Sequence, residues 1–319
     1  MLKIKNLLLI TFISFIGSYS LTAQQAESTA TSIPSVSADK KALLWEITGK
    51  DLSKPSYLYG TIHMIPKKDF FLSDAAKKAI DSCKRVTFEI NMKDMNNPMA
   101  LVGVFMKAMM NDGSRLKDLV SKEDYKLVKN HFDSLGLPMA MLERVKPMFL
   151  SVMVDGGGAQ MNPFDTTATE SANVSYEFEI MRIAEKQKKE FAGLETMEFQ
   201  MSIFDSIPYK AQAEMLVKSV KSGGKGGDNE FAKMVEMYKE QDIEAMAKML
   251  NPSDSSDTEG LGQYETMLVT TRNLNWIPLM GKSMAKRSTF FAVGAGHLGG
   301  EKGVVNLLRK EGYTLRPLK

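Results

Sequence analysis

Two of the three histidines in this chain of 319 residues stand in the same frame, three positions after a glycine. The copies are GTIH at residues 60–63 and GAGH at residues 294–297. Each copy follows a run that predicts a buried β-strand, residues 56–59 and 289–293. A glycine at a strand end lets the backbone turn sharply and directs the following side chain into a cleft. We therefore expect the two motifs to be two halves of one site.

The segments around the two motifs repeat in the same order, which indicates an internal duplication. After the first motif, a helix is expected from the N-cap Ser73 to Cys83, and then a strand at residues 85–90. After the second, a helix is expected at residues 304–310 and a strand at residues 313–315. Such units favour parallel strands with helices on the sheet faces. The predicted fold is α/β, with a central mixed sheet built from two related strand–helix–strand halves.

Between the two halves the pattern is mostly helical. This insertion, about residues 95–285, is expected to form a large helical cap over one face of the core, with one further short strand at residues 190–193. Pro278 predicts a kink or a break in its last helix. Helices are expected at residues 97–110, 121–135, 147–154, 176–188, 209–221, 229–238, 243–250 and 264–284.

Residues 1–23 have the pattern of a secretory signal peptide. A positively charged start precedes an apolar core at residues 7–16, and small residues follow up to Ala23. The core is shorter than the roughly 20 residues of a membrane span, although a retained anchor is a second interpretation. Residues 24–38 are expected to be a flexible leader, and residues 39–319 to form the folded domain. We expect export to the periplasm or the medium, with no transmembrane segment after signal removal.

Composition narrows the classes of partner and chemistry. Lys and Arg number 41 against 38 Asp and Glu and are interspersed, so nothing indicates a nucleic-acid partner. The single cysteine, Cys83, excludes an intramolecular disulfide and is expected to be a buried small hydrophobe. The 24 methionines have three interpretations: they fill the core, they line a plastic groove for peptides, or they bind copper through their thioethers. The serine-hydrolase, HExxH, P-loop and Rossmann motifs are absent from the sequence.

Metal ligation is the functional interpretation of the two motifs. His63 and His297 are candidate imidazole ligands, and Glu89, in an otherwise apolar strand, is a candidate carboxylate ligand. Two imidazoles and one carboxylate leave positions open for water and substrate, which suits metal-dependent hydrolysis. The second half has no carboxylate equivalent to Glu89. The alternative is structural: each histidine bonds backbone at a strand end, and Glu89 faces solvent at a sheet edge.

Four other residues are weaker candidates. Glu195 follows the predicted strand at residues 190–193, and Glu177 begins another helix; acidic residues at helix starts also simply complement the helix dipole. Arg272 is expected on a long helix, where a solvated face is the default. His131 lacks the glycine and is expected at the surface.

The chain resembles the TraB/GumN family, which includes the Tiki proteins, through seven short motifs in the family's order. They are YLYGTIH at residues 57–63, FE at 88–89, KP at 146–147, SYE at 175–177, GLET at 193–196, RN at 272–273 and GAGHL at 294–298. The resemblance implies a Tiki-like α/β core of two related halves, shared more distantly with erythromycin esterases and haem-binding ChaN proteins.

The resemblance also implies a chemistry. Tiki proteins are metal-dependent proteases with two Gly-x-x-His motifs and an acidic residue, and manganese or cobalt is implicated. Carried to this chain, the metal ligands are His63, His297 and Glu89. Glu195 and Arg272 become candidates for a general base and for binding an oxyanion or a substrate carboxylate. Many relatives have an aspartate near the position of Glu177, so this glutamate is either a chemical replacement or a bystander.

The leading hypothesis is an exported, metal-dependent hydrolase, most concretely a peptidase, that acts on a peptide or small-molecule substrate. Its cofactor is expected to be a divalent ion, manganese, cobalt or zinc. The alternative is a non-catalytic envelope protein that binds a peptide, a pheromone or haem in the same cleft. A third hypothesis, a structural partner in envelope assembly, needs neither metal nor ligand.

Overall fold

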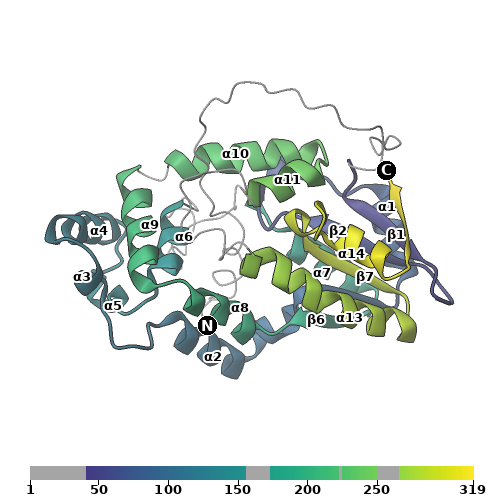
Figure 1. Cartoon of the computed structure of the whole chain (residues 1–319), viewed down its shortest axis with the longest axis horizontal. Coiled ribbons are helices and arrows are strands. Elements are labelled where there is room, and N and C mark those ends of the chain that lie inside the picture. The colour runs from purple at the N-terminus through teal and green to yellow at the C-terminus, as the bar shows by residue number, and fades with distance from the viewer. Residues whose placement is uncertain (1–40, 156–172, 223–224, 251–265) are drawn as a thin grey trace, which may run out of the picture.

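A mixed six-stranded sheet forms the centre of the computed structural model (Figure 1). The structure describes residues 41–155, 173–222, 225–250 and 266–319. The strand order is β6-β4-β7-β2-β1-β8, in which β1 is antiparallel to both neighbours and the β6-β4-β7-β2 pairs are parallel. The strands are β1 (Leu44–Thr48), β2 (Ser56–Thr61), β4 (Arg85–Ile90), β6 (Glu190–Glu195), β7 (Thr289–Gly294) and β8 (Thr314–Leu318). The predicted α/β class and mixed sheet are confirmed.

The two strand–helix–strand units are both present, and they are interleaved. In the first, β2 leads through α1 (Asp74–Ser82) to β4, and the connection passes β7. In the second, β7 leads through α14 (Val304–Lys310) to β8, and the connection passes β2 and β1. The connections run in opposite directions, so right-handed crossovers place α1 and α14 on opposite faces of the sheet. Interleaving also makes β2 and β7 neighbours, which brings the two histidine motifs to one edge.

Local signals explain why these elements form. The hydroxyl of Ser73 accepts the Ala76 N–H at 3.1 Å, as expected of an N-cap. All six residues of β7 are buried, which accounts for its uninterrupted apolar run, because a central parallel strand is covered on both faces. Cys83 is buried directly after α1, as predicted, and burial raises the pKa of its thiol to about 12.

The helical region lies between β4 and β7, and within it the chain returns to the sheet once, as β6. Its first helices extend beside the sheet in Figure 1 instead of covering one face, because they pack on a hydrophobic cluster of their own that includes Leu116, Phe132 and Leu216. The helices are α2 (Pro98–Ala108), α3 (Leu116–Leu119), α4 (Lys122–Ser134), α5 (Met139–Leu142), α6 (Pro147–Asp155), α7 (Tyr176–Lys186), α8 (Met197–Ile203), α9 (Tyr209–Lys221), α10 (Lys225–Lys239), α11 (Ile243–Leu250) and α13 (Thr271–Lys286).

We predicted either a kink or a break of this helix at Pro278. Helix α13 continues through Pro278, so the prediction of a break is wrong. Pro278 lies on the exposed side of the helix, so solvent can hydrate the carbonyl that lacks a partner. The irregular segment lies earlier, where residues Thr266–Thr270 form a π-helical turn that leads into α13.

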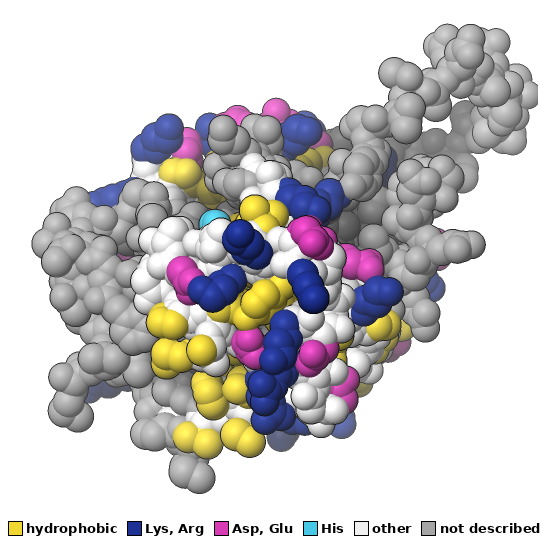
Figure 2. All heavy atoms as spheres, turned by 90° about the vertical axis from the view of Figure 1, so that its left-hand side faces the viewer, with side chains coloured by type: hydrophobic (Ala, Val, Ile, Leu, Met, Phe, Trp, Pro, Cys, Tyr) yellow, Lys and Arg dark blue, Asp and Glu magenta, His cyan; other side chains and the backbone are white. Residues whose placement is uncertain are grey.

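Figure 2 shows the outer end of the helical region, where acidic and basic side chains are interspersed. This mixture agrees with the balanced composition. Some methionines also face solvent, such as Met141 on α5, whereas others, such as Met139, fill the core. The predicted signal peptide and leader, residues 1–38, lie outside the described residues. None of the helices in the described ranges is long and apolar enough to cross a bilayer.

Candidate functional site

The predicted site residues meet at the carboxyl ends of the parallel strands. The register pairs Thr61 at the end of β2 with Gly294 at the end of β7, so the two histidine motifs leave neighbouring strands at the same level. Glu89 and Glu195 lie at the ends of β4 and β6. In open α/β sheets this edge is where ligands bind. Folding therefore gathers candidates from both ends of the chain.

The first motif needs its glycine for space. Gly60 does not have a left-handed φ, so the sharp turn that we expected is not the reason for this residue. A Cβ atom on Gly60 would lie 2.9 Å from Cβ of Ala295 and 3.1 Å from Cδ2 of Leu298. Ala295 belongs to the second motif. The glycine thus allows the two histidine segments to pack directly against each other.

The ring of His297 is held in one tautomer by Asn273. Nδ2 of Asn273 donates to the carbonyls of His297 and Lys302, so Oδ1 faces Nδ1 of His297 at 2.7 Å and accepts its proton. Nε2 of the neutral ring therefore carries the lone pair, 4.0 Å from Oε1 of Glu89. Burial and the guanidinium of Arg272 lower the pKa of His297 to about 3, so the ring is neutral at pH 7.

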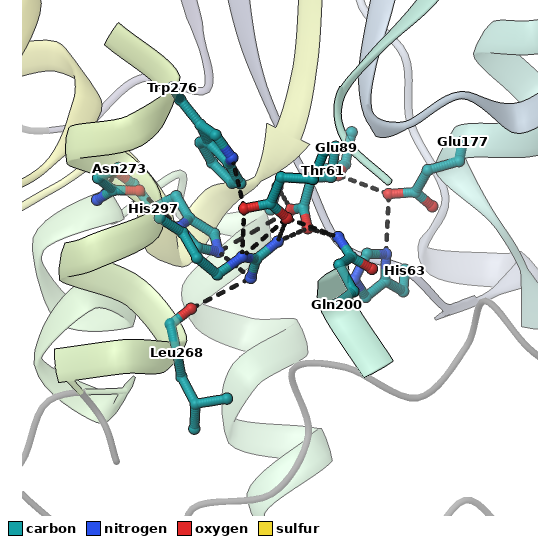
Figure 3. A network of polar contacts seen from close by, with 12 residues as sticks. Thr61, His63, Glu89, Glu177, Gln200, Leu268, Asn273, Trp276 and His297 are labelled. Carbon is teal, nitrogen blue, oxygen red and sulfur yellow. Dashed lines mark hydrogen bonds and ion pairs between the residues drawn. The ribbon is translucent and has the colours of Figure 1, made fainter. Parts of the chain in front are cut away.

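Glu177, at the start of α7, holds the other histidine (Figure 3). Its Oε1 lies 3.0 Å from Nδ1 of His63 and accepts the Thr61 hydroxyl at 2.7 Å, while the Ser175 hydroxyl donates to Oε2. Burial alone would lower the pKa of His63, but the carboxylates of Glu177 and Glu89 outweigh it and raise that pKa. Nε2 of His63 is buried and has no hydrogen-bond partner among the described residues. Histidines that ligate metals commonly have such a carboxylate behind them.

Glu89 is buried and ionised. Its Oε1 accepts the N–H of Gly294 at 2.8 Å, and its Oε2 accepts Nη2 of Arg272 at 2.6 Å. Burial would raise the pKa of Glu89, but Arg272 and then the two histidines hold it at about 2. The structure therefore excludes the alternative in which Glu89 faces solvent at a sheet edge.

Arg272 is buried on α13 at the centre of this network, not on a solvated face. Its Nε and Nη2 donate to the carboxylate of Glu195 at 3.1 and 2.9 Å, and its Nη2 also donates to Glu89. Its Nη1 donates to the Leu268 carbonyl at 3.1 Å and lies 3.2 Å from Nε2 of His297. Each N–H of this guanidinium thus meets a protein acceptor.

Two residues that we did not single out complete the network around Glu195. Nε1 of Trp276 donates to Glu195 at 2.8 Å, and Nε2 of Gln200 donates to both Glu195 and Glu89 at 3.2 Å. Gln200 and Trp276 lie on the buried stripes of α8 and α13. A residue with a polar group at a position that the helical periodicity predicts to be buried is the sequence signal that would have identified Gln200 and Trp276. The sequence analysis includes Asn273 only as part of the RN motif and predicts no role for it at the site.

Other features lie away from this cluster. His131 is half-buried on α4, although we expected it at the surface, and burial lowers its pKa. A cleft of about 670 Å³ lies between α3, α4 and α9, and none of the predicted site residues line it. In the described part of the chain, no three His, Cys, Asp or Glu side chains converge closely enough to hold a metal ion as they stand.

The fold and this cluster define an α/β protein with a buried histidine–glutamate site at the carboxyl edge of its parallel strands. The TraB/PrgY/gumN family model matches residues 43–317, and the chain belongs to that family, which confirms the resemblance.

Curated relatives carry a metalloprotease name. The chain is 23% identical over 325 residues to the metalloprotease TIKI1 of Danio rerio, covering 87% of this chain and 63% of the relative. It is 22% identical to TIKI2 of Xenopus tropicalis, with 89% and 61% covered, and 21% identical to human TIKI1, with 87% and 62% covered. The chain thus spans less than two thirds of the length of these relatives. No solved structure matches it.

Proposed function

We propose that this chain is an exported, divalent-metal-dependent hydrolase, most concretely a peptidase. The main support is a pair of imidazole nitrogens at neighbouring strand ends. Nε2 of His63 is buried without a hydrogen-bond partner among the described residues. Nε2 of His297 carries a lone pair, because Asn273 accepts the proton on Nδ1 of the same ring. The metalloprotease name of the relatives supports the reaction class, and the signal-peptide pattern of residues 1–23 supports export.

The charges at the site also favour a divalent ion. Glu89, Glu177 and Glu195 place three carboxylates in the network, and Arg272 places one guanidinium there. An imidazole that ligates a metal is neutral, so with His63 and His297 as ligands these described groups leave two negative charges in a buried site. Uncompensated buried charge is costly, so the donor set fits an ion of charge +2.

His63, His297 and Glu89 would hold this ion. When bound by such a set, a divalent ion acts as a Lewis acid towards a carbonyl group and generates a nucleophile from water at neutral pH. Glu177 and Asn273 each orient one imidazole ring from behind, so the two Nε2 atoms are presented with their lone pairs. This preorganisation is the part of the mechanism that the protein supplies.

Glu195 and Arg272 have a positioning role in this proposal. Glu195 holds the guanidinium in place with the help of Trp276, and the guanidinium keeps Glu89 ionised. The roles that the resemblance implies, base for Glu195 and oxyanion binding for Arg272, remain predictions. For Arg272, that role requires one N–H to leave its present acceptor.

Replacement of each histidine in turn tests the proposal. We expect His63→Ala and His297→Ala to lose binding of Mn²⁺, Co²⁺ and Zn²⁺, measured by calorimetry on protein without a polyhistidine tag. Both should also lose cleavage of a peptide library, read by mass spectrometry. His131→Ala on α4 is the matched control and should retain both properties. Cleavage retained by a folded His63→Ala protein contradicts the mechanism, and peptide retained without product identifies a binding protein instead.

A further inference from the structure

Arg272 contacts two of the groups that the proposed ion needs. Its Nη2 is bonded to Oε2 of Glu89 at 2.6 Å, and its Nη1 lies 3.2 Å from Nε2 of His297. The arginine is anchored independently of these two contacts, because Nε and Nη2 also hold Glu195 and Nη1 also donates to the Leu268 carbonyl. In Figure 3 the side chains of His297 and Glu89 both belong to the network of polar contacts marked by dashed lines.

His297 has a single lone pair, which limits this ring to one cationic partner at a time. Asn273 accepts the Nδ1 proton, so Nε2 is the only nitrogen of this ring that can bind a cation. In the structure this lone pair faces an N–H of Arg272. A guanidinium N–H and a metal ion cannot share it. Glu89 has two carboxylate oxygens and can serve both cations, whereas His297 can serve only one.

We propose that Arg272 and the divalent ion are mutually exclusive partners of His297, so that binding of the ion releases Nη1 of Arg272 into the site. This inference rests on the proposed function. The contacts to Glu195 do not involve His297, and they keep the guanidinium beside the ligands after the exchange. The released N–H is then free to donate to a carbonyl or carboxylate oxygen of a substrate. Substrate binding by Arg272 thereby depends on prior loading of the ion.

Arg272→Lys tests this exchange at constant charge. The ammonium has a single nitrogen, which cannot contact Glu195 and His297 together as the guanidinium fork does. We expect Arg272→Lys to bind Mn²⁺ or Co²⁺ about tenfold more tightly than the unmodified protein, because no charge-assisted hydrogen bond to His297 has to be broken. Arg272→Gln should bind more tightly still. Arg182→Lys, in an exposed pair with Glu179 on α7, is the control and should bind unchanged.

The outcomes separate this inference from the proposed function. Ion binding by the unmodified protein with equal or weaker binding by folded Arg272→Lys overturns the exchange and leaves the proposed function standing. Ion binding by none of the proteins overturns both. Circular dichroism checks the fold, and Arg272→Lys decides the question if Arg272→Gln unfolds. In crystals grown with Co²⁺, we expect Nη1 to lie beyond hydrogen-bond distance of His297, and a retained contact beside the bound ion overturns the inference.

Discussion

Oε1 of Glu177 lies 3.0 Å from Nδ1 of His63, and this contact defines the role of the glutamate. The carboxylate stands behind the imidazole, on the side away from Nε2. It is also fixed by the hydroxyls of Thr61 and Ser175. We therefore expect Glu177 to orient one of the two candidate histidine ligands and not to be a bystander.

Glu177→Gln should weaken ion binding by about 10–100-fold, the usual cost of losing a group behind a histidine ligand. It should also lower the pKa of His63, since burial would then act with less opposition from a carboxylate. Calorimetry measures the affinity, and histidine NMR in the presence of chelator measures the pKa. Glu179→Gln on the same helix is the control. An unchanged pKa of His63 contradicts the assigned role.

Gly60→Ala should destabilise the protein by about 1–3 kcal/mol, because the added methyl meets Ala295 at 2.9 Å. Urea unfolding measures the free energy. Ala295→Gly in the same chain should recover part of the loss. Gly103→Ala in α2 is the control, since its methyl meets Glu198 at 3.5 Å and alanine favours helix, so stability should rise by up to about 1 kcal/mol. Equal changes in the free energy of unfolding for Gly60→Ala and Gly103→Ala would contradict close packing of the two histidine motifs.

Acid should destabilise the metal-free protein through His297. Folding lowers the pKa of this ring to about 3. Between about pH 6.5 and pH 3 the ring is therefore protonated in the unfolded chain but neutral in the folded protein, so the free energy of unfolding falls as the pH falls through this range. The difference in free energy of unfolding between the unmodified protein and His297→Asn should therefore fall by roughly 2 kcal/mol from pH 7 to pH 5. Urea titrations with chelator at both pH values measure it. A difference independent of pH refutes the assignment of a neutral, buried ring.

Cys83 should be unreactive until the protein unfolds. It is buried, and burial raises its pKa to about 12, so little thiolate forms at neutral pH. A thiol reagent should label the native protein negligibly and label one thiol per chain in urea. Rapid labelling under native conditions would show that the end of α1 opens readily.

Much of the local structure could be predicted because it depends on nearby residues. The periodicity of residues 304–310 and 209–221 predicts α14 and α9 with their exact bounds. The N-cap at Ser73 likewise follows from its own hydroxyl and the helix after it. The predicted break at Pro278 was wrong, because a helix tolerates a proline on its solvent-exposed side, and the local sequence does not show which side is exposed.

The sequence by itself determined the α/β class, the two histidine motifs at strand ends and Glu89 as the acidic candidate, because each is a pattern within a few residues. Only the tertiary structure decided that β2 and β7 are neighbours, that Glu177 holds His63 and that Arg272 reaches both Glu89 and His297. Strand order and the position of the first turns of α13 beside the carboxyl ends of the strands set those contacts. A periodic pattern shows which face of a helix is buried, but the partner of that face depends on how distant segments pack.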